Sequence, residues 1–375
     1  MPSVYIHVPF CQSRCIYCDF YSTTSLEKQA RYIERLEREM RDRQVEWDSR
    51  ARTLSIYIGG GTPSTLPPRL MCRMMKTVTT LYPPAGDAEI TIEANPDDVT
   101  EEWVEALKTT PVNRVSMGVQ TFHDELLHTL RRRHSSEQAR RAVQLLHKAG
   151  YTNISIDLIY GLPGQSLSMW DDDITEALRL GIPHISAYSL MYEEGTPITR
   201  MLESGLIEEM SDEMSWQCYE LLCQRLQEAG YEHYEVSNFA LPGMHSRHNS
   251  GYWTGNPYLG FGAGAHSYDG KRTRRCNKDS LDEYLNHPDD NEYFETEELT
   301  DTDLYNEYVM TRLRTSKGFA LTEVEERFGR EALHHCLEMM QPHLQKENLI
   351  RNVDQVYLSR KGVFVSNDVI SDLFL

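Results

Sequence analysis

The stretch Tyr5-Ile-His-Val-Pro-Phe-Cys-Gln-Ser-Arg-Cys-Ile-Tyr-Cys-Asp-Phe20 carries three cysteines within eight residues, in a C-x3-C-x2-C arrangement. They follow directly on a short apolar segment, residues 4–8, which is typical of a β-strand and is ended by Pro9. Three thiolates this close together can hold one metal centre, and they leave that centre one ligand short. The stretch therefore predicts a metal-binding loop directly after the first strand of the fold.

The cysteine spacing admits two kinds of metal centre. A closed zinc site needs a fourth ligand, for which His7 and Asp19 are candidates, but this spacing without a second cysteine pair is unusual for zinc. A [4Fe–4S] cluster normally takes four thiolates, so three thiolates leave one iron open to an exogenous ligand. The spacing favours an iron–sulfur cluster with Cys11, Cys15 and Cys18 as its ligands.

Composition limits the class of protein. The net charge of −19 over 375 residues argues against non-specific nucleic-acid binding, which depends on Lys and Arg neutralising phosphates. The first residues lack the basic region of a secretory signal, and no window approaches the roughly 20 apolar residues of a membrane helix. We therefore expect a cytoplasmic protein, in which the remaining cysteines stay reduced as buried or incidental thiols.

Strands and helices alternate through the first half of the chain. Strands are predicted at residues 4–8, 54–58, 89–94, 114–119, 153–159 and 184–190. Helices are predicted between them at residues 25–43, 69–81, 100–108, 135–149 and 168–180. Ser25, Thr100 and Ser135 are the expected N-caps of three of these helices. Such alternation favours parallel strands with helices outside, in either a partial or complete α/β barrel or an open doubly wound sheet.

The alternation stops after residue 190. A helix is predicted at 212–229 and a seventh strand at 231–236, followed by a segment, 239–279, that is rich in Gly, His and aromatic residues. From residue 281 the pattern is mostly helical, with helices at 299–314, 322–328 and 331–347 and a strand at 355–359.

We expect one domain over residues 1–280 and a second, smaller one over 281–375. The polar residues that mark the connection between them are Asp279, Asp282, Pro288, Asp289 and Asp290. The order of helices and hairpin in the second domain is also that of a winged-helix-like module. Because the chain is so acidic, a helical cover for an open barrel is the preferred interpretation.

Polar and glycine residues gather where the predicted strands end. The cysteine loop follows the first strand and Gly59-Gly-Gly-Thr62 the second, while Glu93 and Gln120 end the third and fourth. In a barrel or an open sheet, the carboxyl ends of parallel strands share one face, which carries the active site. Three consecutive glycines exceed the needs of a turn and would let a ligand approach the backbone closely.

Asp157 lies in the fifth strand between Ile156 and Leu158. Alternation along the strand places its side chain on the opposite face from theirs. If the two apolar residues face the helices, Asp157 points into the barrel. A buried carboxylate is unfavourable unless it is paired, so we expect a function or a tight ion pair there.

Five motifs together resemble a known family. They are Tyr5-Ile-His-Val-Pro-Phe-Cys11, Gly59-Gly-Gly-Thr-Pro-Ser64, Ser116-Met-Gly-Val-Gln-Thr-Phe122, Asp157-Leu-Ile-Tyr-Gly-Leu-Pro163 and Arg247-His-Asn-Ser-Gly-Tyr-Trp253. The first is similar to the cluster loop of the radical S-adenosylmethionine (SAM) superfamily. As a set the motifs resemble the oxygen-independent coproporphyrinogen III oxidase family, and within it the HemW-type haem chaperones. The resemblance covers essentially the whole chain.

The resemblance implies a fold, a set of cofactors and roles for individual residues. The fold would be a partial (β/α)6 barrel with a C-terminal helical domain. Cys11, Cys15 and Cys18 would bind a [4Fe–4S] cluster whose open iron takes the amino and carboxylate groups of SAM. The other cofactor contacts would be made by Tyr5, Gly60, Gly61, Thr62, Glu93, Gln120, Arg132 and Asp157.

Two features separate the oxidases of this family from its chaperones. The oxidase pattern has a further cysteine two residues after the third, where this chain has Phe20, and the oxidases carry a long extension before the motif that begins here at Tyr5. The 247–253 segment matches the H-N-x-x-Y-W signature of the haem-binding branch. His248 is the leading candidate for a haem ligand and His245 the second, since haem iron is commonly held by imidazole.

Two functions follow as expectations. The first is a haem chaperone that binds haem and a SAM-coordinating cluster and passes haem to acceptor proteins. The alternative is a radical SAM oxidase acting on coproporphyrinogen III, which Phe20 places in doubt. The resemblance also admits peripheral association with a membrane and either a monomer or a dimer.

Overall fold

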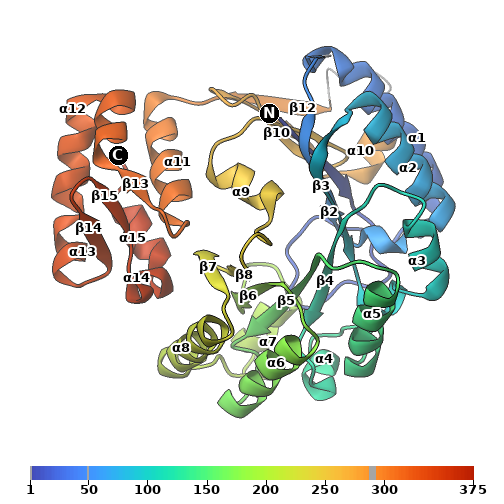
Figure 1. Ribbon diagram of the computed structural model, residues 1–375, viewed down its shortest axis with the longest axis horizontal. Coiled ribbons are helices and arrows are strands. Elements are labelled where there is room, and N and C mark those ends of the chain that lie inside the picture. The colour runs from blue at the N-terminus through green and yellow to red at the C-terminus, as the bar shows by residue number, and fades with distance from the viewer. Residues whose placement is uncertain (1, 49, 287–292) are drawn as a thin grey trace.

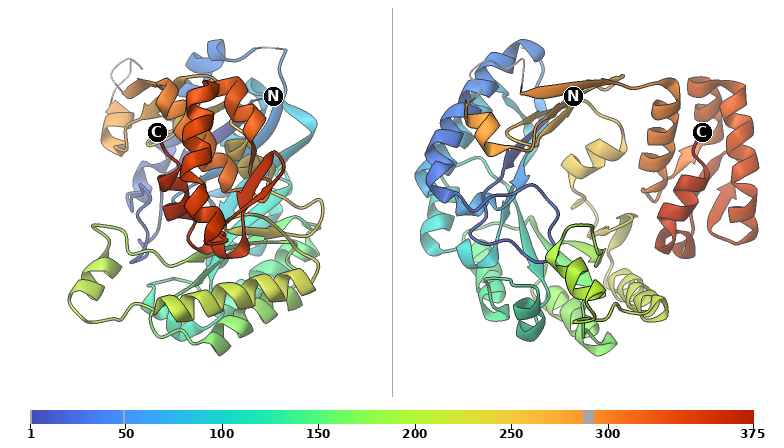
Figure 2. Two further views of the ribbon diagram at one scale, coloured as in Figure 1. Left: turned by 90° about the vertical axis from the view of Figure 1, so that its left-hand side faces the viewer. Right: turned by 180° about the vertical axis from the view of Figure 1, so that it is seen from behind.

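The computed structural model describes residues 2–48, 50–286 and 293–375. Its larger part is a curved sheet with helices on the outside, and the C-terminal helices form a separate body beside it (Figures 1 and 2). Pro288, Asp289 and Asp290, which mark the expected connection between the domains, lie outside the described residues.

All six predicted strands of the barrel are confirmed, and they pair in parallel in their order along the chain. They are β1 (Ser3–Val8), β2 (Thr53–Gly60), β3 (Pro84–Ala94), β4 (Arg114–Gln120), β5 (Ile154–Tyr160) and β6 (His184–Ser189). The barrel does not close on itself. Beyond β1 lies β9 (Tyr258–Phe261), in parallel, and beyond β6 lies β8 (Asn238–Ala240), antiparallel. The fold is therefore the partial barrel, and the open doubly wound sheet is excluded.

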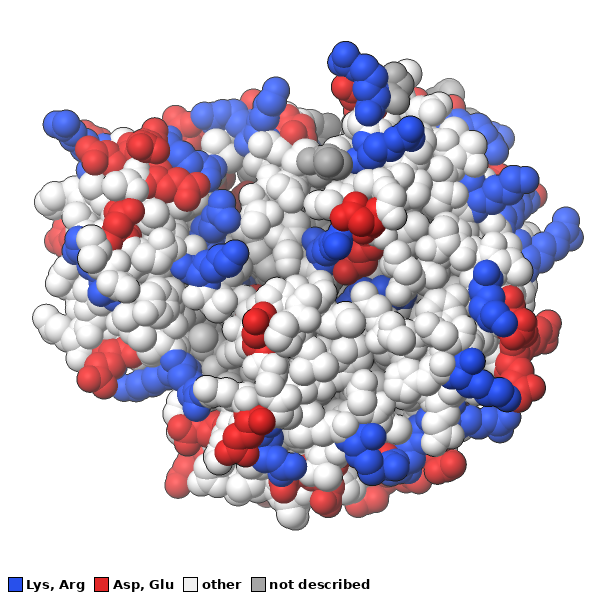
Figure 3. All heavy atoms as spheres, in the orientation of Figure 1, with Lys and Arg blue, Asp and Glu red and all other residues white. Residues whose placement is uncertain are grey.

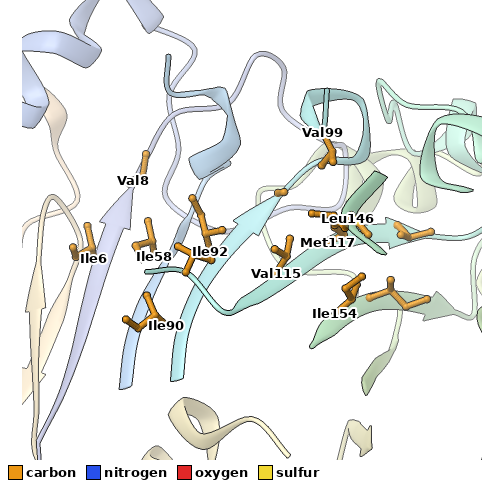
Figure 4. Packing of buried hydrophobic residues seen from close by; sticks show 14 of the residues in the cluster. Ile6, Val8, Ile58, Ile90, Ile92, Val99, Val115, Met117, Leu146 and Ile154 are labelled. Carbon is orange, nitrogen blue, oxygen red and sulfur yellow. The ribbon is translucent and has the colours of Figure 1, made fainter. Parts of the chain in front are cut away.

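Helices cover the outer face of this sheet (Figure 1). They are α1 (Gln29–Asp42), α2 (Pro68–Leu81), α3 (Glu101–Leu107), α5 (Ser136–Lys148), α6 (Leu167–Arg179) and α8 (Asp212–Glu228). Neighbouring strands bring branched side chains such as Ile58, Ile92 and Val115 together on one face of the sheet (Figure 4). Ile156 and Leu158 are fully buried in the same core, so Asp157 faces the barrel interior as expected.

Two of the three predicted N-caps are confirmed. The Thr100 hydroxyl accepts a hydrogen bond from the Trp103 backbone, and Ser135 forms a capping box with Gln138. The prediction for Ser25 is wrong. Its side chain makes no capping bond, because a short 3₁₀ turn (Leu26–Lys28) precedes α1 and the Ser25 N–H instead donates to the Thr23 hydroxyl.

Several short elements lie where the sequence shows no periodic pattern. The helices are α4 (Asp124–Thr129), α7 (Pro197–Glu203), α9 (Arg247–Trp253) and α10 (Leu281–Asn286). The predicted seventh strand is β7 (Glu232–Glu235), which pairs antiparallel with β8 at one edge of the sheet. The other edge is extended by β10 (His266–Tyr268), β11 (Thr273–Asn277) and β12 (Phe294–Glu298).

The C-terminal domain has the order of a winged helix. It contains α11 (Asp301–Leu313), β13 (Phe319–Ala320), α12 (Leu321–Met339), α13 (Gln341–Gln345), β14 (Leu349–Asn352), β15 (Gln355–Leu358), α14 (Arg360–Phe364) and α15 (Ser366–Asp372). The predicted break between two helices falls inside α12 at Gly329, whose φ of 86° interrupts the helical backbone. No helix in the described part of the chain is long and apolar enough to cross a bilayer.

The two domains have separate hydrophobic cores. Tyr284, Leu285 and Tyr293 belong to the core of the barrel, and the ion pair between Lys28 and Asp282 holds α10 to the 3₁₀ turn before α1. The core of the C-terminal domain begins at Tyr305. We therefore propose that the division between the two domains lies after residue 293, later than the division at residue 280 expected from the sequence.

Candidate functional site

A cavity of about 510 Å³ lies at the carboxyl ends of the barrel strands. The loop that carries the cysteines lies on the far side of the molecule in Figure 1 and on the near side in the right panel of Figure 2. All of the predicted site residues except His248 line this cavity. They are Tyr5, Cys11, Cys15, Cys18, Gly60, Gly61, Thr62, Glu93, Gln120, Arg132 and Asp157. Segments far apart in the sequence therefore meet at one site, as the strand order predicted.

The three thiols are partly exposed and have polar neighbours. The Cys11 Sγ lies 3.4 Å from the Thr62 hydroxyl, and the Cys15 Sγ accepts a hydrogen bond of 3.2 Å from Arg132. Burial raises the pKa of Cys11 and raises that of Cys18 to about 11. Each of these two thiols must therefore lose a proton to become a ligand, which makes metal loading dependent on pH.

Arg132 connects the cysteine loop to two strands. Besides Cys15, its guanidinium donates to the Asn95 side chain and, at 2.6 Å, to the Gly118 carbonyl oxygen. Its Nε is buried without a hydrogen-bond partner among the described residues. A cation beside a cysteine favours the thiolate, which is the form that binds metals.

The glycine run after β2 leaves room for the cysteine loop. A Cβ on Gly60, where φ is 112°, would lie 2.7 Å from the His7 ring, and one on Gly61 would lie 2.8 Å from the Pro9 backbone. The Gly61 N–H donates to the Val8 carbonyl oxygen at 2.9 Å. Because glycine has no side chain, Gly60 and Gly61 leave space for His7 and for the backbone of Pro9. The backbones of both glycines also line the cavity.

Glu93 and Asp157 are carboxyl groups inside the barrel. Burial raises the pKa of Glu93 to about 7, against the opposing effect of the Tyr57 hydroxyl, which donates to its Oε1 at 2.7 Å. The Gly60 N–H donates to the other carboxylate oxygen at 3.1 Å. Burial raises the pKa of Asp157 to about 6, although a hydrogen bond from Ser186 favours the charged form. Neither carboxyl group forms a tight ion pair, as considered for Asp157, with any residue that the structure describes, so both remain available to a cationic ligand.

Gln120 ends β4 in an unusual backbone conformation. Its φ of 70° is in the left-handed region, which a residue with a side chain rarely adopts. Such strain is concentrated at functional sites. The buried side chain lines the cavity next to Gly118, where a Cβ would lie 2.8 Å from the Gln120 Nε2. The conformation therefore fits the predicted role of Gln120 in binding a ligand.

The zinc alternative does not fit the arrangement of side chains. His7 is buried, with Nδ1 bonded to the Tyr5 hydroxyl at 3.0 Å and Nε2 to the Tyr21 carbonyl oxygen at 3.1 Å, and burial lowers its pKa to about 4. Among the residues that the structure describes, no three His, Cys, Asp or Glu side chains converge closely enough for one metal ion. A [4Fe–4S] cluster holds its thiolates further apart than a single ion does, because each thiolate binds a different iron. Three cysteines beside Arg132 therefore fit a cluster.

His248 lies beneath the cavity, in α9, and does not line it. It is 2% exposed, its Nδ1 lies 2.8 Å from the Ser55 hydroxyl, and its Nε2 lies 2.9 Å from the Tyr252 hydroxyl. Burial lowers its pKa to about 3. With both ring nitrogens bonded inside the protein, His248 has no free nitrogen for a haem iron, and its predicted role as a haem ligand finds no support in the structure.

Residues near His248 also make their contacts inside the protein. Glu89 accepts hydrogen bonds from the backbone N–H groups of Arg247 and His248, at 3.0 and 3.1 Å, at the start of α9. The second haem-ligand candidate, His245, lies 2.7 Å from the Glu232 carboxylate and stacks on Tyr234. From α9, Asn249 does line the cavity.

Several residues of the cavity carried no signal in the sequence. They are Arg14, Arg114, Arg131, Arg133, Met191 and Glu193. Arg14 lies between two of the cysteines, and its position in a metal-binding loop is the one clue that the sequence offers. Arg131, Arg133, Met191 and Glu193 depend on how the loops after β4 and β6 fold back over the strand ends, which no local pattern predicts. Arg114 begins β4 itself.

Models of two protein families match the chain. The model described as the radical SAM superfamily matches residues 5–177, and the HemN C-terminal domain matches residues 299–365. The first match contains the cysteine loop and five of the barrel strands, and the second covers most of the winged-helix domain.

Curated relatives cover the chain from end to end. A protein of Bacillus subtilis (strain 168) named "Heme chaperone HemW" is 35% identical and covers 98% of both chains. Its namesake from Escherichia coli (strain K12) is 38% identical over 70% of this chain and 69% of its own. Among solved structures, coproporphyrinogen III oxidase (HemN) from Escherichia coli, described as a radical SAM enzyme, superposes with a TM-score of 0.85. At 22% identity, over 100% of this chain and 90% of that one, it supports the fold alone.

Proposed function

The chain belongs to the family of the heme chaperones HemW, and we propose that it binds haem and delivers it to an acceptor protein. The observation that carries this proposal is identity of about a third along the full length of relatives with that name. The cavity at the barrel mouth adds a chemical argument, because it brings the three thiols together with Arg132 and the buried carboxyl groups of Glu93 and Asp157.

We propose that Cys11, Cys15 and Cys18 hold a [4Fe–4S] cluster in this cavity. Bound there with one open iron, the cluster supplies one-electron chemistry to a SAM molecule on that iron. Arg132 fixes the loop by binding Cys15, Asn95 and Gly118 together. It also adds the positive charge that three thiolates favour.

Next to the cysteines, the remaining predicted residues offer groups that match SAM. The Gly60 and Gly61 backbone and the Thr62 hydroxyl border the cavity, as do the carboxyl groups of Glu93 and Asp157. A carboxylate accepts hydrogen bonds from an ammonium group, and a hydroxyl group such as that of Thr62 donates to a carboxylate. SAM carries both an ammonium and a carboxylate, so we propose that it lies along this wall.

A titration with haemin tests the haem part of the proposal. Purified protein, reconstituted with iron and sulfide without oxygen, is titrated while the Soret band is followed. We expect saturable binding at one haem per chain, followed by transfer of the haem to an added apo-haemoprotein. Absence of saturation would remove the haem assignment.

The alternative function is oxidation of coproporphyrinogen III. The fold is that of the oxidase HemN, but Phe20 stands where the oxidase pattern has a further cysteine. We expect no decarboxylation of coproporphyrinogen III and no 5′-deoxyadenosine above the background without substrate. Turnover of the porphyrinogen by the reconstituted protein would favour the oxidase instead.

A further inference from the structure

Exposed apolar side chains gather at the mouth of the cavity. Phe20 is 67% exposed, Met191 61% and Tyr188 42%, and all three line this cavity. They come from the cysteine loop, from β6 and from the segment directly after β6. Large apolar side chains from separate segments that are exposed around one opening mark a binding surface. The surface is called the apolar rim below.

Two arginines without partners lie on the same cavity. Arg14 and Arg131 are exposed, and neither guanidinium forms a hydrogen bond or an ion pair with a described residue. In contrast, the neighbouring Arg133 is paired with Asp97 and Asp98 at 2.9 and 3.2 Å. Because Arg14 and Arg131 line one opening and neither is neutralised by an acidic partner, their positive charge is available there to an anionic ligand.

Other faces of the molecule differ from this opening. On the face drawn in Figure 3, acidic and basic side chains are interspersed around the edge and the centre is mostly uncharged. The cavity interior is also different, because the cysteines, Glu93 and Asp157 make it polar. The combination of apolar side chains and unpaired arginines therefore points to a ligand that is largely apolar and carries carboxylates at one edge.

We propose that haem binds across the cavity mouth, with its propionates on Arg14 and Arg131 and its macrocycle against the apolar rim. This inference rests on the proposed function and names the site for it. Haem has two carboxylates at one edge of an apolar plane, and guanidinium groups bind carboxylates in a bidentate manner. Phe20 and Tyr188 offer rings to the face of the macrocycle. The volume of about 510 Å³ within the cavity is left for the cluster and SAM.

The site also explains what Phe20 does. Its side chain is exposed at the end of the cysteine loop, and exposure of an apolar ring to water is unfavourable. Covered by haem, the same ring is removed from water at the point nearest the cluster ligands. Haem and cluster would then share one mouth of the barrel, without a role for His248.

The test compares haem with haem dimethyl ester, whose propionates are blocked. For haem, Arg14→Gln with Arg131→Gln is expected to raise the dissociation constant by about tenfold or more, since each charge-assisted contact is worth roughly that factor. For the diester, the same variant and the wild type should bind alike. Arg38→Gln with Arg69→Gln is the matched control, because both arginines are exposed, neither guanidinium pairs with a described residue, and both lie away from the cavity.

A second pair of variants tests the apolar rim. Phe20→Ser with Met191→Ser should weaken haem and diester equally, whereas Leu206→Ser, which is 74% exposed elsewhere, should change neither. Iron content after reconstitution confirms that every variant still loads its cluster. If the wild type binds haem and the arginine variant binds it equally well, this site is wrong while the proposed function stands. If the wild type binds no haem, both the proposed function and this site are contradicted.

Discussion

Glu93 makes stability depend on pH. Its pKa is raised to about 7 in the folded chain, from an ordinary 4.5, mainly by burial. A raised carboxyl pKa contributes stability that is fully present below about pH 4.5 and is lost as pH rises through about 7. For the metal-free protein, we expect the free energy of unfolding of the wild type, relative to Glu93→Gln, to fall by about 2–3 kcal/mol between pH 4.5 and 8.

Urea unfolding at a series of pH values, with a thiol reductant and without metal, measures this difference. The Gln variant keeps the shape of the side chain and its hydrogen-bond acceptor for Tyr57 but does not titrate. If wild type and variant lose stability in parallel across the range, the shifted pKa of Glu93 is contradicted.

Arg132 is the residue on which the cysteine loop depends most. Lysine at this position keeps the charge but cannot reach Cys15, Asn95 and Gly118 together, as the arginine fork does. We expect Arg132→Lys to lower the free energy of unfolding by about 1–3 kcal/mol and to reduce the iron bound per chain after reconstitution. Arg131→Lys is the control, since Arg131 makes no such contacts and both quantities should match the wild type.

At the scale of elements, two serines were expected to cap helices. The prediction was correct for Ser135 and wrong for Ser25. Ser135→Ala removes the capping box of α5 and should lower the free energy of unfolding by about 1 kcal/mol. Ser25→Ala should leave it unchanged, because that side chain caps nothing. Equal losses in urea unfolding of the two variants would contradict the structure at the start of α1.

The regular elements of the barrel were predictable because each has its own local signal. β-branched runs mark the strands, and caps or glycines end the helices. The elements after β6 could not be predicted, since β9 pairs with β1 from more than two hundred residues away and α9 has only seven residues. Pairing at that distance is decided by the fit of the whole barrel and leaves no periodic trace in the sequence.

The residues of the candidate site likewise differ in whether the sequence could predict them. Cys11, Glu93 and Gln120 could be placed together from the sequence, because each follows or ends a strand whose carboxyl end faces the cavity. Asp157 could be added because alternation along β5 points it away from its apolar neighbours. His248 could not be judged, since its partners Ser55 and Tyr252 are revealed only by packing. The unpaired state of Arg14 and Arg131 is likewise a property of the folded surface.

The whole molecule combines a barrel open on one side with a winged-helix domain that has its own core. The cavity belongs entirely to the barrel, as none of its lining residues comes from the part of the chain after residue 249. Among the described residues, the C-terminal domain therefore contributes no side chain to the lining of this cavity. Its surface remains available for other contacts of the protein.

The central claim is that three cysteines at the barrel mouth hold a cluster with one open iron. Anaerobic reconstitution with iron and sulfide, followed by reduction and electron paramagnetic resonance with and without SAM, tests it directly. We predict one [4Fe–4S] signal per chain that changes when SAM is added. The signal should be lost in Cys11→Ser, Cys15→Ser and Cys18→Ser but kept in Cys72→Ser, whose thiol lies on α2 away from the cavity. A chain that binds zinc alone, or a cluster signal that SAM leaves unchanged, would contradict the claim.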